Sequence, residues 1–341
     1  MCGSPLSFCP YDGETMAQWI RLPRDVYSVV EASPGAVLLE TARFDACNRS
    51  SYLFLDPVRT ISAVTLDEVG PLFRQIEEAL EQGFHVAGFL GYECGYAFER
   101  FAGIGAAAQE LPLAWFGVYR KPLIFDHVAG CFDGGGLVAP VEAQPREVPE
   151  RLADSVSLAI TKDEYRARIL KIKECIAAGE TYQVNFTDRV SFQTECSPAV
   201  AYEALSRQQP VAYGAFMNVA GRTVASFSPE LFFRVEGEKI TTRPMKGTMP
   251  RGMDSAEDQV AAARLQNDEK NRSEHVMIVD LLRNDLGRIC KMGSVDVEDI
   301  FSVEKYQTLF QMTSTVSGRL RPGIKYYDLF KSLFPTGPVS T

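Results

Sequence analysis

Apolar and polar residues alternate over short distances through the first 130 residues of the chain. The runs 36–40 (Ala-Val-Leu-Leu-Glu) and 52–55 (Tyr-Leu-Phe-Leu) are bounded by turn residues and predict two strands. Residues 66–82 change to the spacing of an amphipathic helix. The apolar positions of that stretch recur at intervals of three and four: Val69, Leu72, Ile76 and Leu80. Gly83 follows, where a left-handed glycine commonly ends a helix.

An apolar run at 87–92 (Ala-Gly-Phe-Leu-Gly-Tyr) contains two glycines. Inside a strand, glycine permits a neighbouring backbone to approach closely, so the run predicts a buried strand. The glycines lack the order and spacing of a dinucleotide-binding fingerprint, which argues against a Rossmann-type site.

The second half opens with a helix signal. Thr161 and Glu164 have the spacing of a capping box, and Gly179 marks the expected end of the helix. The predicted apolar stripe of this helix consists of Tyr165, Ile169, Ile172 and Ile176. The pattern further predicts a strand over 181–190, a hairpin over 224–244 that turns at Glu236–Gly237, and a helical region over 256–286.

The domain organisation follows from length and from one weakly patterned segment. A chain of 341 residues is long enough for about two domains. Three successive glycines, 134–136, and several prolines make 133–157 the best linker. We therefore expect an N-terminal region at 20–132 and a second region at 158–341.

Composition and charge exclude several classes of protein. With 46% hydrophobic and 23% charged residues, the chain is ordinary globular material rather than disordered or coiled-coil. The net charge of −9 and the lack of any Lys/Arg run argue against a nucleic-acid partner. No stretch is long and apolar enough to predict a membrane span, and residues 1–5 lack the features of an export signal.

Cysteine and histidine usage bears on compartment and metal chemistry. Eight scattered cysteines without a C-x-x-C pair predict reduced thiols and a cytoplasmic location. Three unpaired histidines argue against a zinc site, so a metal would have to be held by carboxylates.

The first chemical candidate is Glu230, in the tripeptide 228–230 (Ser-Pro-Glu). Proline removes a donor from the strand ladder and marks a break there. A carboxylate beside the apolar run 231–233 is poorly hydrated, which raises its pKa and suits a general acid. A solvated turn residue is the alternative that the sequence leaves open.

The second candidate is Lys246, in the segment 243–252 (Arg-Pro-Met-Lys-Gly-Thr-Met-Pro-Arg-Gly). On its C-terminal side no Asp or Glu is nearer than Asp254. A partly buried lysine crowded by arginines loses its proton more easily and becomes an amine nucleophile. A basic surface loop is the alternative.

The third candidate is Glu274, on the predicted helix that also carries Asp285. The two acids share a helix face but stand roughly 16 Å apart along the axis, too far to chelate one ion. Glu274 is therefore predicted as one ligand of a cation whose other carboxylate comes from elsewhere, and Mg²⁺ fits such a site. The remaining polar residues are predicted to form a network and cap that end the helix before Gly287: Asp280, Arg283, Asn284 and Asp285.

Together these segments resemble the chorismate-utilising enzymes, which include anthranilate, isochorismate, salicylate and aminodeoxychorismate synthases. The segments that carry the likeness are 38–40, 88–92, 182–185 (Tyr-Gln-Val-Asn), 228–230, 243–248, 274–285 and 314–318 (Ser-Thr-Val-Ser-Gly). The resemblance implies an α+β fold like that of anthranilate synthase component I, with mixed and antiparallel sheets packed together and helices outside.

Two positions sort the chemistry within that family. Members that add water carry a lysine at the place of Gln183, which argues against isochorismate and salicylate synthesis. Anthranilate synthases usually have alanine at the place of Lys246, whereas Pro-x-Lys-Gly-Thr is similar to the aminodeoxychorismate synthases. The resemblance further implies that Gln183, Thr248 and His275 contact the substrate and that Glu274 binds Mg²⁺.

The implied reaction replaces the C4 hydroxyl of chorismate by an amine. Glu230 would protonate the leaving hydroxyl, Lys246 would attack C2, and ammonia would add at C4 and release the lysine. The sequence contains no Gly-x-Cys-x-Gly nucleophile elbow, so a separate glutaminase subunit would supply the ammonia.

Three further expectations follow from the resemblance. Anthranilate synthase component I is the alternative enzyme. The segment 38–40 only partly matches a tryptophan pocket, so amino-acid binding stays open. The family continues beyond the place of Thr341 with a further metal-binding carboxylate, substrate-gripping groups and strands, so we expect an inactive or poorly folded fragment if the chain ends there.

Overall fold

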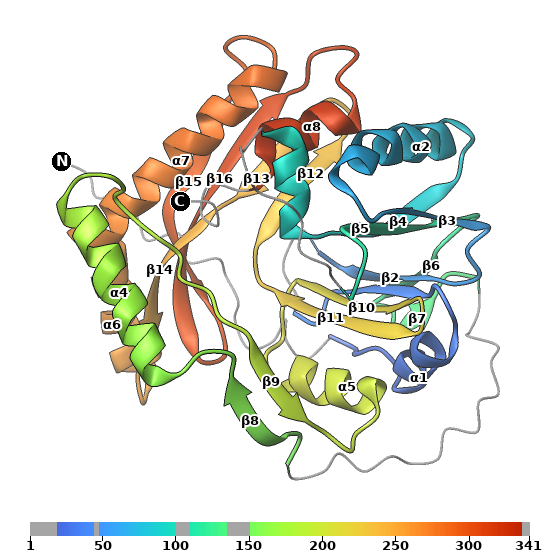
Figure 1. The fold of residues 1–341 in the computed structure, drawn as a ribbon, viewed down its shortest axis with the longest axis horizontal. Helices are drawn as coiled ribbons and strands as arrows, with labels where there is room; N and C mark the ends of the chain where they lie inside the picture. The colour runs from blue at the N-terminus through green and yellow to red at the C-terminus, as the bar shows by residue number, and fades with distance from the viewer. Residues whose placement is uncertain (1–18, 44–47, 100–109, 135–150, 336–341) are drawn as a thin grey trace.

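The fold combines helices with several antiparallel sheets. A computed structural model of the chain describes residues 19–43, 48–99, 110–134 and 151–335 (Figure 1). Three sheets lie at the centre, helices cover their outer faces, and a smaller two-stranded sheet lies to one side. The expected α+β architecture is confirmed. No helix within these ranges has the length and hydropathy needed to cross a membrane.

The largest sheet has six antiparallel strands and draws them from both halves of the chain. Their order is β11 (Arg222–Ser228), β10 (Tyr213–Val219), β1 (Val37–Glu40), β2 (Ser50–Phe54), β6 (Leu123–Asp126) and β7 (Cys131–Phe132). The helices α1 (Asp25–Ala32) and α5 (Pro198–Gln208) pack on it through Val26, Val30 and Tyr202. The predicted regions 20–132 and 158–341 therefore share one sheet.

A three-stranded antiparallel sheet carries the glycine-containing run of the first half. Its strands are β3 (Arg59–Ala63), β5 (Ala114–Tyr119) and β4 (His85–Leu90). The short turn η2 (Leu66–Glu68) leads into α2 (Val69–Glu81), whose apolar stripe covers the sheet. The turn η3 (Tyr92–Cys94) and α3 (Gly95–Phe98) follow β4.

The third sheet is antiparallel and holds most of the candidate chemistry. Its strands are β12 (Leu231–Glu236), β13 (Lys239–Arg243), β16 (Leu309–Arg319), β14 (Met245–Pro250) and β15 (Asp296–Lys305), which also pairs with β16. The helices α6 (Ser255–Asn267) and α7 (Glu269–Ile289) pack on it, and Ile278, Leu282 and Leu286 of α7 are buried there. The helix α8 (Tyr326–Leu333) packs against both α7 and α2 (Figure 1).

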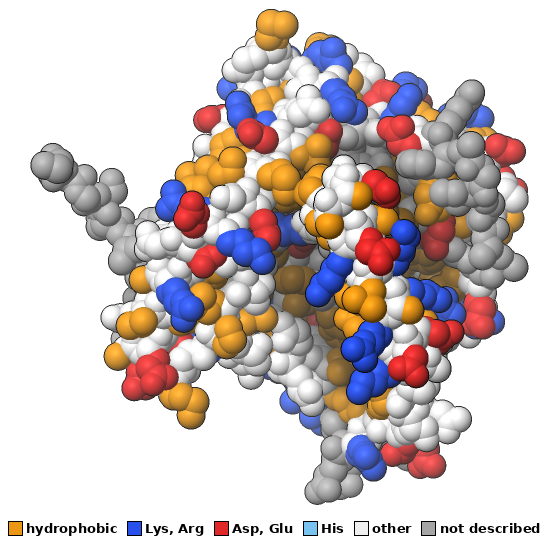
Figure 2. Space-filling model, turned by 60° about the vertical axis from the view of Figure 1, so that its left-hand side comes forward, with side chains coloured by type: hydrophobic (Ala, Val, Ile, Leu, Met, Phe, Trp, Pro, Cys, Tyr) orange, Lys and Arg blue, Asp and Glu red, His pale blue; other side chains and the backbone are white. Residues whose placement is uncertain are grey.

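The segment 154–193 forms a unit that buries none of its residues. It consists of β8 (Asp154–Leu158), α4 (Lys162–Ala177) and β9 (Val190–Gln193), and none of the residues in these elements is buried. Large apolar side chains such as Leu158, Leu170 and Phe192 are exposed. On the side of the molecule that carries α4, hydrophobic side chains lie exposed between charged ones (Figure 2).

Most local predictions are confirmed. The predicted strands at 36–40 and 52–55 are β1 and β2, and Gly83 and Gly179 follow their helices with φ of 82° and 74°. Thr161 and Glu164 form the capping box of α4. The predicted hairpin over 224–244 is confirmed only in part: β12 and β13 form it around a turn at 237–238, whereas 224–228 belong to β11 in another sheet. The helical region 256–286 is α6 followed by α7.

Two expectations differ from the structure. No strand forms over 181–189, because within the described chain these residues pair with no neighbouring strand; β9 begins only at Val190. The predicted linker 133–157 contains the first residues of β8, and its part at 135–150 lies outside the described residues.

Gly88 tests the close-packing interpretation of the glycine run. A Cβ placed on Gly88 would lie 2.0 Å from the carbonyl oxygen of Trp115, so backbone would have to move. We expect Gly88→Ala to lower the free energy of unfolding by about 1–3 kcal/mol in urea titrations. Gly70, in α2, has nothing within 4 Å of an added Cβ. Gly70→Ala should therefore stabilise the protein by about 0.5–1 kcal/mol, and equal effects of the two variants would contradict the interpretation.

Candidate active site

Glu230 lies where the chain passes from one sheet to another. β11 ends at Ser228 in the six-stranded sheet, and β12 begins at Leu231 in the five-stranded sheet. Ser228 Oγ accepts a hydrogen bond from the Glu230 amide at 3.2 Å and fixes this crossing. The half-buried carboxylate accepts a hydrogen bond from the Met245 amide to Oε1, also at 3.2 Å. Glu230 is thus joined to the start of β14.

The surroundings of Glu230 favour its protonated form. Burial raises the pKa of Glu230, while the Met245 amide and the positive charge of Lys246 oppose that rise. Because burial is the largest of these effects, the carboxyl holds its proton more readily than a solvated glutamate. The acid predicted from the apolar run after Pro229 therefore has the expected environment.

Lys246 lies on a β-bulge of β14. Met245 pairs with Thr313 and Thr248 with Gln311, so Lys246 and Gly247 stand opposite the single residue between those partners. Gly247 has φ of 91°, and a Cβ there would lie 3.1 Å from Asn271 of α7. A bulge redirects the side chains that it carries, and here it carries the half-buried Lys246, whose positive charge acts on Glu230.

The two arginines that flank Lys246 in sequence are engaged elsewhere. Arg251 binds Asp258 through Nε and Nη2, and this pair holds the pKa of Asp258 well below its usual range. Arg243 pairs with Glu304. The two arginines are therefore paired with carboxylates, whereas the positive charge of Lys246 acts on Glu230.

His275 and Thr248 occupy different depths of the same region. His275 is fully buried, and its Nε2 lies 2.7 Å from Ser314 Oγ. Thr248 is exposed and donates a hydrogen bond of 2.8 Å to Gln311 Oε1. Both lie near the bulge, but only Thr248 is at the surface, so direct contact of His275 with a substrate has no support from its placement.

Glu274 is the carboxylate predicted to bind a cation. It lies on α7, its side chain is 41% exposed, and its Oε1 is 3.8 Å from Lys270 Nζ. Among the described residues no group of three or more His, Cys, Asp or Glu gathers as a metal site. These residues alone therefore do not build a resident Mg²⁺ site, which needs further oxygen ligands.

Gln183 is not joined to the other candidates by any contact described for it. It lies in the loop between α4 and β9, and its Nε2 donates to Asn185 Oδ1 at 3.2 Å. Thr181 Oγ1 donates to its backbone carbonyl at 3.0 Å. Its predicted role as a substrate contact stays a prediction.

Glu304 lies near the candidate site, but no sequence pattern indicated it. Its carboxylate binds Arg243 and lies 3.7 Å from Arg43 Nη1. It also accepts hydrogen bonds from Tyr306 Oη at 3.1 Å and Thr313 Oγ1 at 3.2 Å. Arg43 comes from the N-terminal half, so no local pattern could have revealed this convergence. The cluster ties that half to β15 and β16.

A narrow cavity beside this cluster is lined partly by Pro229, Leu231 and Met245. Its volume of about 10 Å³ hardly admits one water molecule. The structure therefore shows this flank of the Glu230 crossing closed.

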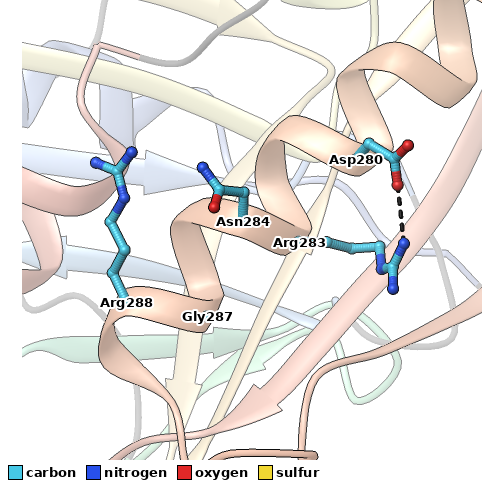
Figure 3. A pocket seen from close by; sticks show the side chains of 5 residues that line it. All are labelled: Asp280, Arg283, Asn284, Gly287 and Arg288. Atoms are coloured by element: carbon cyan, nitrogen blue, oxygen red, sulfur yellow. Dashed lines mark hydrogen bonds and ion pairs between the residues drawn. The ribbon is translucent and has the colours of Figure 1, made fainter.

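A second, wider depression of about 560 Å³ lies along the C-terminal half of α7 (Figure 3). Arg283 Nη1 donates to Asp280 Oδ1 at 2.8 Å, as the dashed line in Figure 3 shows. The predicted polar pairing is therefore present. The predicted cap before Gly287 is wrong, because α7 continues through that residue to Ile289.

The chain matches one family model and several known proteins. The family model for chorismate binding enzymes matches residues 41–340. The chain is 31% identical to aminodeoxychorismate synthase component 1 of Salmonella typhimurium, over 92% of this chain and 76% of that protein. It is 30% identical to the Bacillus subtilis protein of the same name, over 89% and 73%.

Anthranilate synthases are similar as well. The chloroplastic alpha subunit 1 of Oryza sativa subsp. indica is 30% identical, over 92% of this chain and 62% of that protein. The crystal structure of anthranilate synthase component I from Streptococcus pneumoniae superposes with a TM-score of 0.72 at 23% identity, covering 87% of this chain and 75% of that one. The chain therefore shares the fold of anthranilate synthase component I.

The raised pKa of Glu230 predicts a pH-dependent cost to stability. The folded protein binds this proton more tightly than the unfolded chain, so stability is lost as pH rises through the raised pKa. Glu230→Gln removes the ionisation but keeps the shape. We expect a higher melting temperature than the parent at about pH 8, with the difference vanishing near pH 4.

The matched control is Glu236→Gln, at an exposed carboxylate that ends β12. It should show no such pH-dependent difference in thermal melts. A Glu230→Gln variant that melts below the parent at about pH 8 would show that the ionised carboxylate stabilises the fold.

Proposed function

The chain belongs to the chorismate binding enzyme family, and from this premise we propose that it aminates chorismate to 4-amino-4-deoxychorismate, the activity named for its relatives in Salmonella and Bacillus. The observation that carries the proposal is Lys246, held on a bulge where its positive charge acts on the half-buried Glu230 carboxyl. An amine and an acid in this arrangement supply the two groups that displacement of the C4 hydroxyl requires.

The proposed chemistry uses the Lys246 amine as the nucleophile and Glu230 as the acid. Burial raises the pKa of Glu230, so its environment favours the protonated carboxyl that can donate to the leaving group.

The reaction then proceeds in two displacements. The Lys246 amine forms a bond to C2, the two ring double bonds shift, and the C4–O bond breaks while the oxygen takes the Glu230 proton and leaves as water. The attacking amine gives up a proton, which restores the acid. Ammonia next bonds to C4, the double bonds shift back, and the C2–N bond breaks while the Lys246 nitrogen takes the Glu230 proton. The new ammonium group at C4 gives one proton back to Glu230, which restores both residues.

Ammonia requires a supplier, and we propose a separate glutaminase subunit. The relatives are named as component 1 of their synthases, and the chain itself lacks a Gly-x-Cys-x-Gly elbow. Free ammonia at high concentration should replace the partner.

Anthranilate synthesis is the second candidate. It is favoured by the identity to the rice subunit and by the likeness to the Streptococcus structure. Both reactions start from chorismate and ammonia, but anthranilate formation aminates C2 and eliminates pyruvate. Lys246, where anthranilate synthases usually have alanine, argues for the first reaction.

Product analysis separates these functions. With chorismate, ammonia and Mg²⁺, we expect 4-amino-4-deoxychorismate and a mass adduct on Lys246 in the quenched protein. Lys246→Ala should lose the adduct, and its kcat should fall by about 10²–10⁴. Lys239→Ala, at an exposed lysine of β13, is the matched control. Anthranilate as the product, or full activity of Lys246→Ala, would overturn the proposal.

We also propose that Mg²⁺ enters with the substrate and that Glu274 is a protein ligand to it. Chelation with EDTA should then abolish turnover, and Glu274→Gln should raise the Mg²⁺ concentration for half-maximal activity by at least about tenfold. The control Glu269→Gln changes an exposed acid on the first turn of the same helix. Equal Mg²⁺ requirements for the two variants would contradict a role for Glu274.

A further inference from the structure

The bulge that carries Lys246 is held by more than its own strand. Lys246 and Gly247 interrupt the regular ladder between β14 and β16, so strand pairing alone does not fix the lysine. Helix α7 packs directly against this place, with Asn271 close to Gly247 and His275 one turn further along. The imidazole of His275 is fully buried beneath the bulge.

A second irregularity lies on the other side of β16. Glu298 pairs with Thr315 and Ser302 with Thr313, so residues 299–301 stand opposite Ser314 alone. Asp299 and Phe301 both have positive φ, 51° and 62°. Such conformations are strained for residues other than glycine and persist only where their surroundings hold them.

Ser314 and His275 connect these two irregular segments. Ser314 Oγ accepts a hydrogen bond from the Phe301 amide at 3.2 Å and lies 2.7 Å from His275 Nε2. A hydroxyl can accept from the Phe301 amide and still either donate to Nε2 or accept from it, whereas the backbone carbonyl of Lys246 near the ring can only accept. We therefore assign the ring proton of a neutral His275 to Nδ1, with the Ser314 hydroxyl donating to Nε2.

Nδ1 faces the backbone of Lys246. The Lys246 carbonyl favours the protonated ring, but burial outweighs it and lowers the pKa of His275 to about 4. Nδ1 makes no hydrogen bond of ordinary geometry in the structure, although the Lys246 backbone is near enough to act on the ring. A neutral ring with one N–H toward Lys246 is the resulting state.

We propose that His275 is a positioning residue, which with Ser314 holds the bulge so that Lys246 stays beside Glu230. The inference rests on the proposed role of Lys246, but it concerns the strand rather than the reaction. Its central element is a chain of contacts from Phe301 through Ser314 and His275 to the Lys246 carbonyl.

Two isosteric replacements of His275 test the roles of its two ring nitrogens one at a time. The amide nitrogen of His275→Asn can take the place of Nδ1 and donate to the Lys246 carbonyl, whereas that of His275→Gln can take the place of Nε2 and reach only Ser314. The proposal predicts that Gln lowers kcat by about tenfold with little change in KM, and that Asn retains most of kcat. Equal loss in both variants, or no loss in Gln, would overturn it.

Amide hydrogen exchange tests the same clamp without chorismate. In His275→Gln, exchange in a peptide covering Met245–Pro250 should accelerate by at least about threefold, while in His275→Asn it should stay near the parent. Val279→Ala removes buried volume from the same helix without touching Lys246 and controls for general loosening of α7. Unchanged exchange in His275→Gln, or equal acceleration in Val279→Ala, would exclude the clamp.

The two measurements also separate this inference from the function on which it rests. Should the parent protein form no aminated product, the proposed function fails, and hydrogen exchange still decides whether His275 holds the bulge. Ser314→Ala provides an independent variant should His275→Gln fail to fold. It should match the kcat loss of His275→Gln, and the double variant should lose no more than either single one. Additive losses would overturn the proposal.

Discussion

The chemistry proposed for this chain depends on one hydrogen bond at the crossing between two sheets, in which the Met245 amide donates to the Glu230 carboxylate at 3.2 Å. This bond joins the chain crossing after β11 to the first residue of β14, one residue before Lys246. Leu231, which follows Glu230, pairs with Arg243 of β13 and also keeps the crossing close to the start of β14. Burial raises the pKa of Glu230 at this place.

The rest of the molecule keeps that junction in place. β10 and β11 attach the second half of the chain to strands of the first half, and Arg43 reaches from the first half to Glu304 on β15. Helix α7 supports the far side, where His275 and Asn271 lie under the bulge. Supports from distant parts of the sequence thus surround the region of Glu230 and β14.

The sequence predicted what depends on neighbouring residues and missed what depends on distant ones. The capping box at Thr161 and the helix-ending Gly83 are local signals, and both are confirmed. The strand expected over 181–190 had the right alternation but no partner among the described strands, and alternation alone cannot supply ladder hydrogen bonds. No sequence pattern marked Glu304, because its contacts are with Arg43 and Arg243, which are distant in the chain.

Only Pro229 and Glu230 separate β11 from β12, although these strands belong to different sheets. A two-residue link cannot be lengthened or shortened without displacing one of the two strands. The number of residues in the link is therefore a stricter requirement than the identity of the side chains around it. Natural variation and engineered libraries should therefore tolerate many side-chain exchanges around this crossing, yet insertions or deletions within it should be absent from working variants. The length of this link is therefore a structural requirement of the proposed active site.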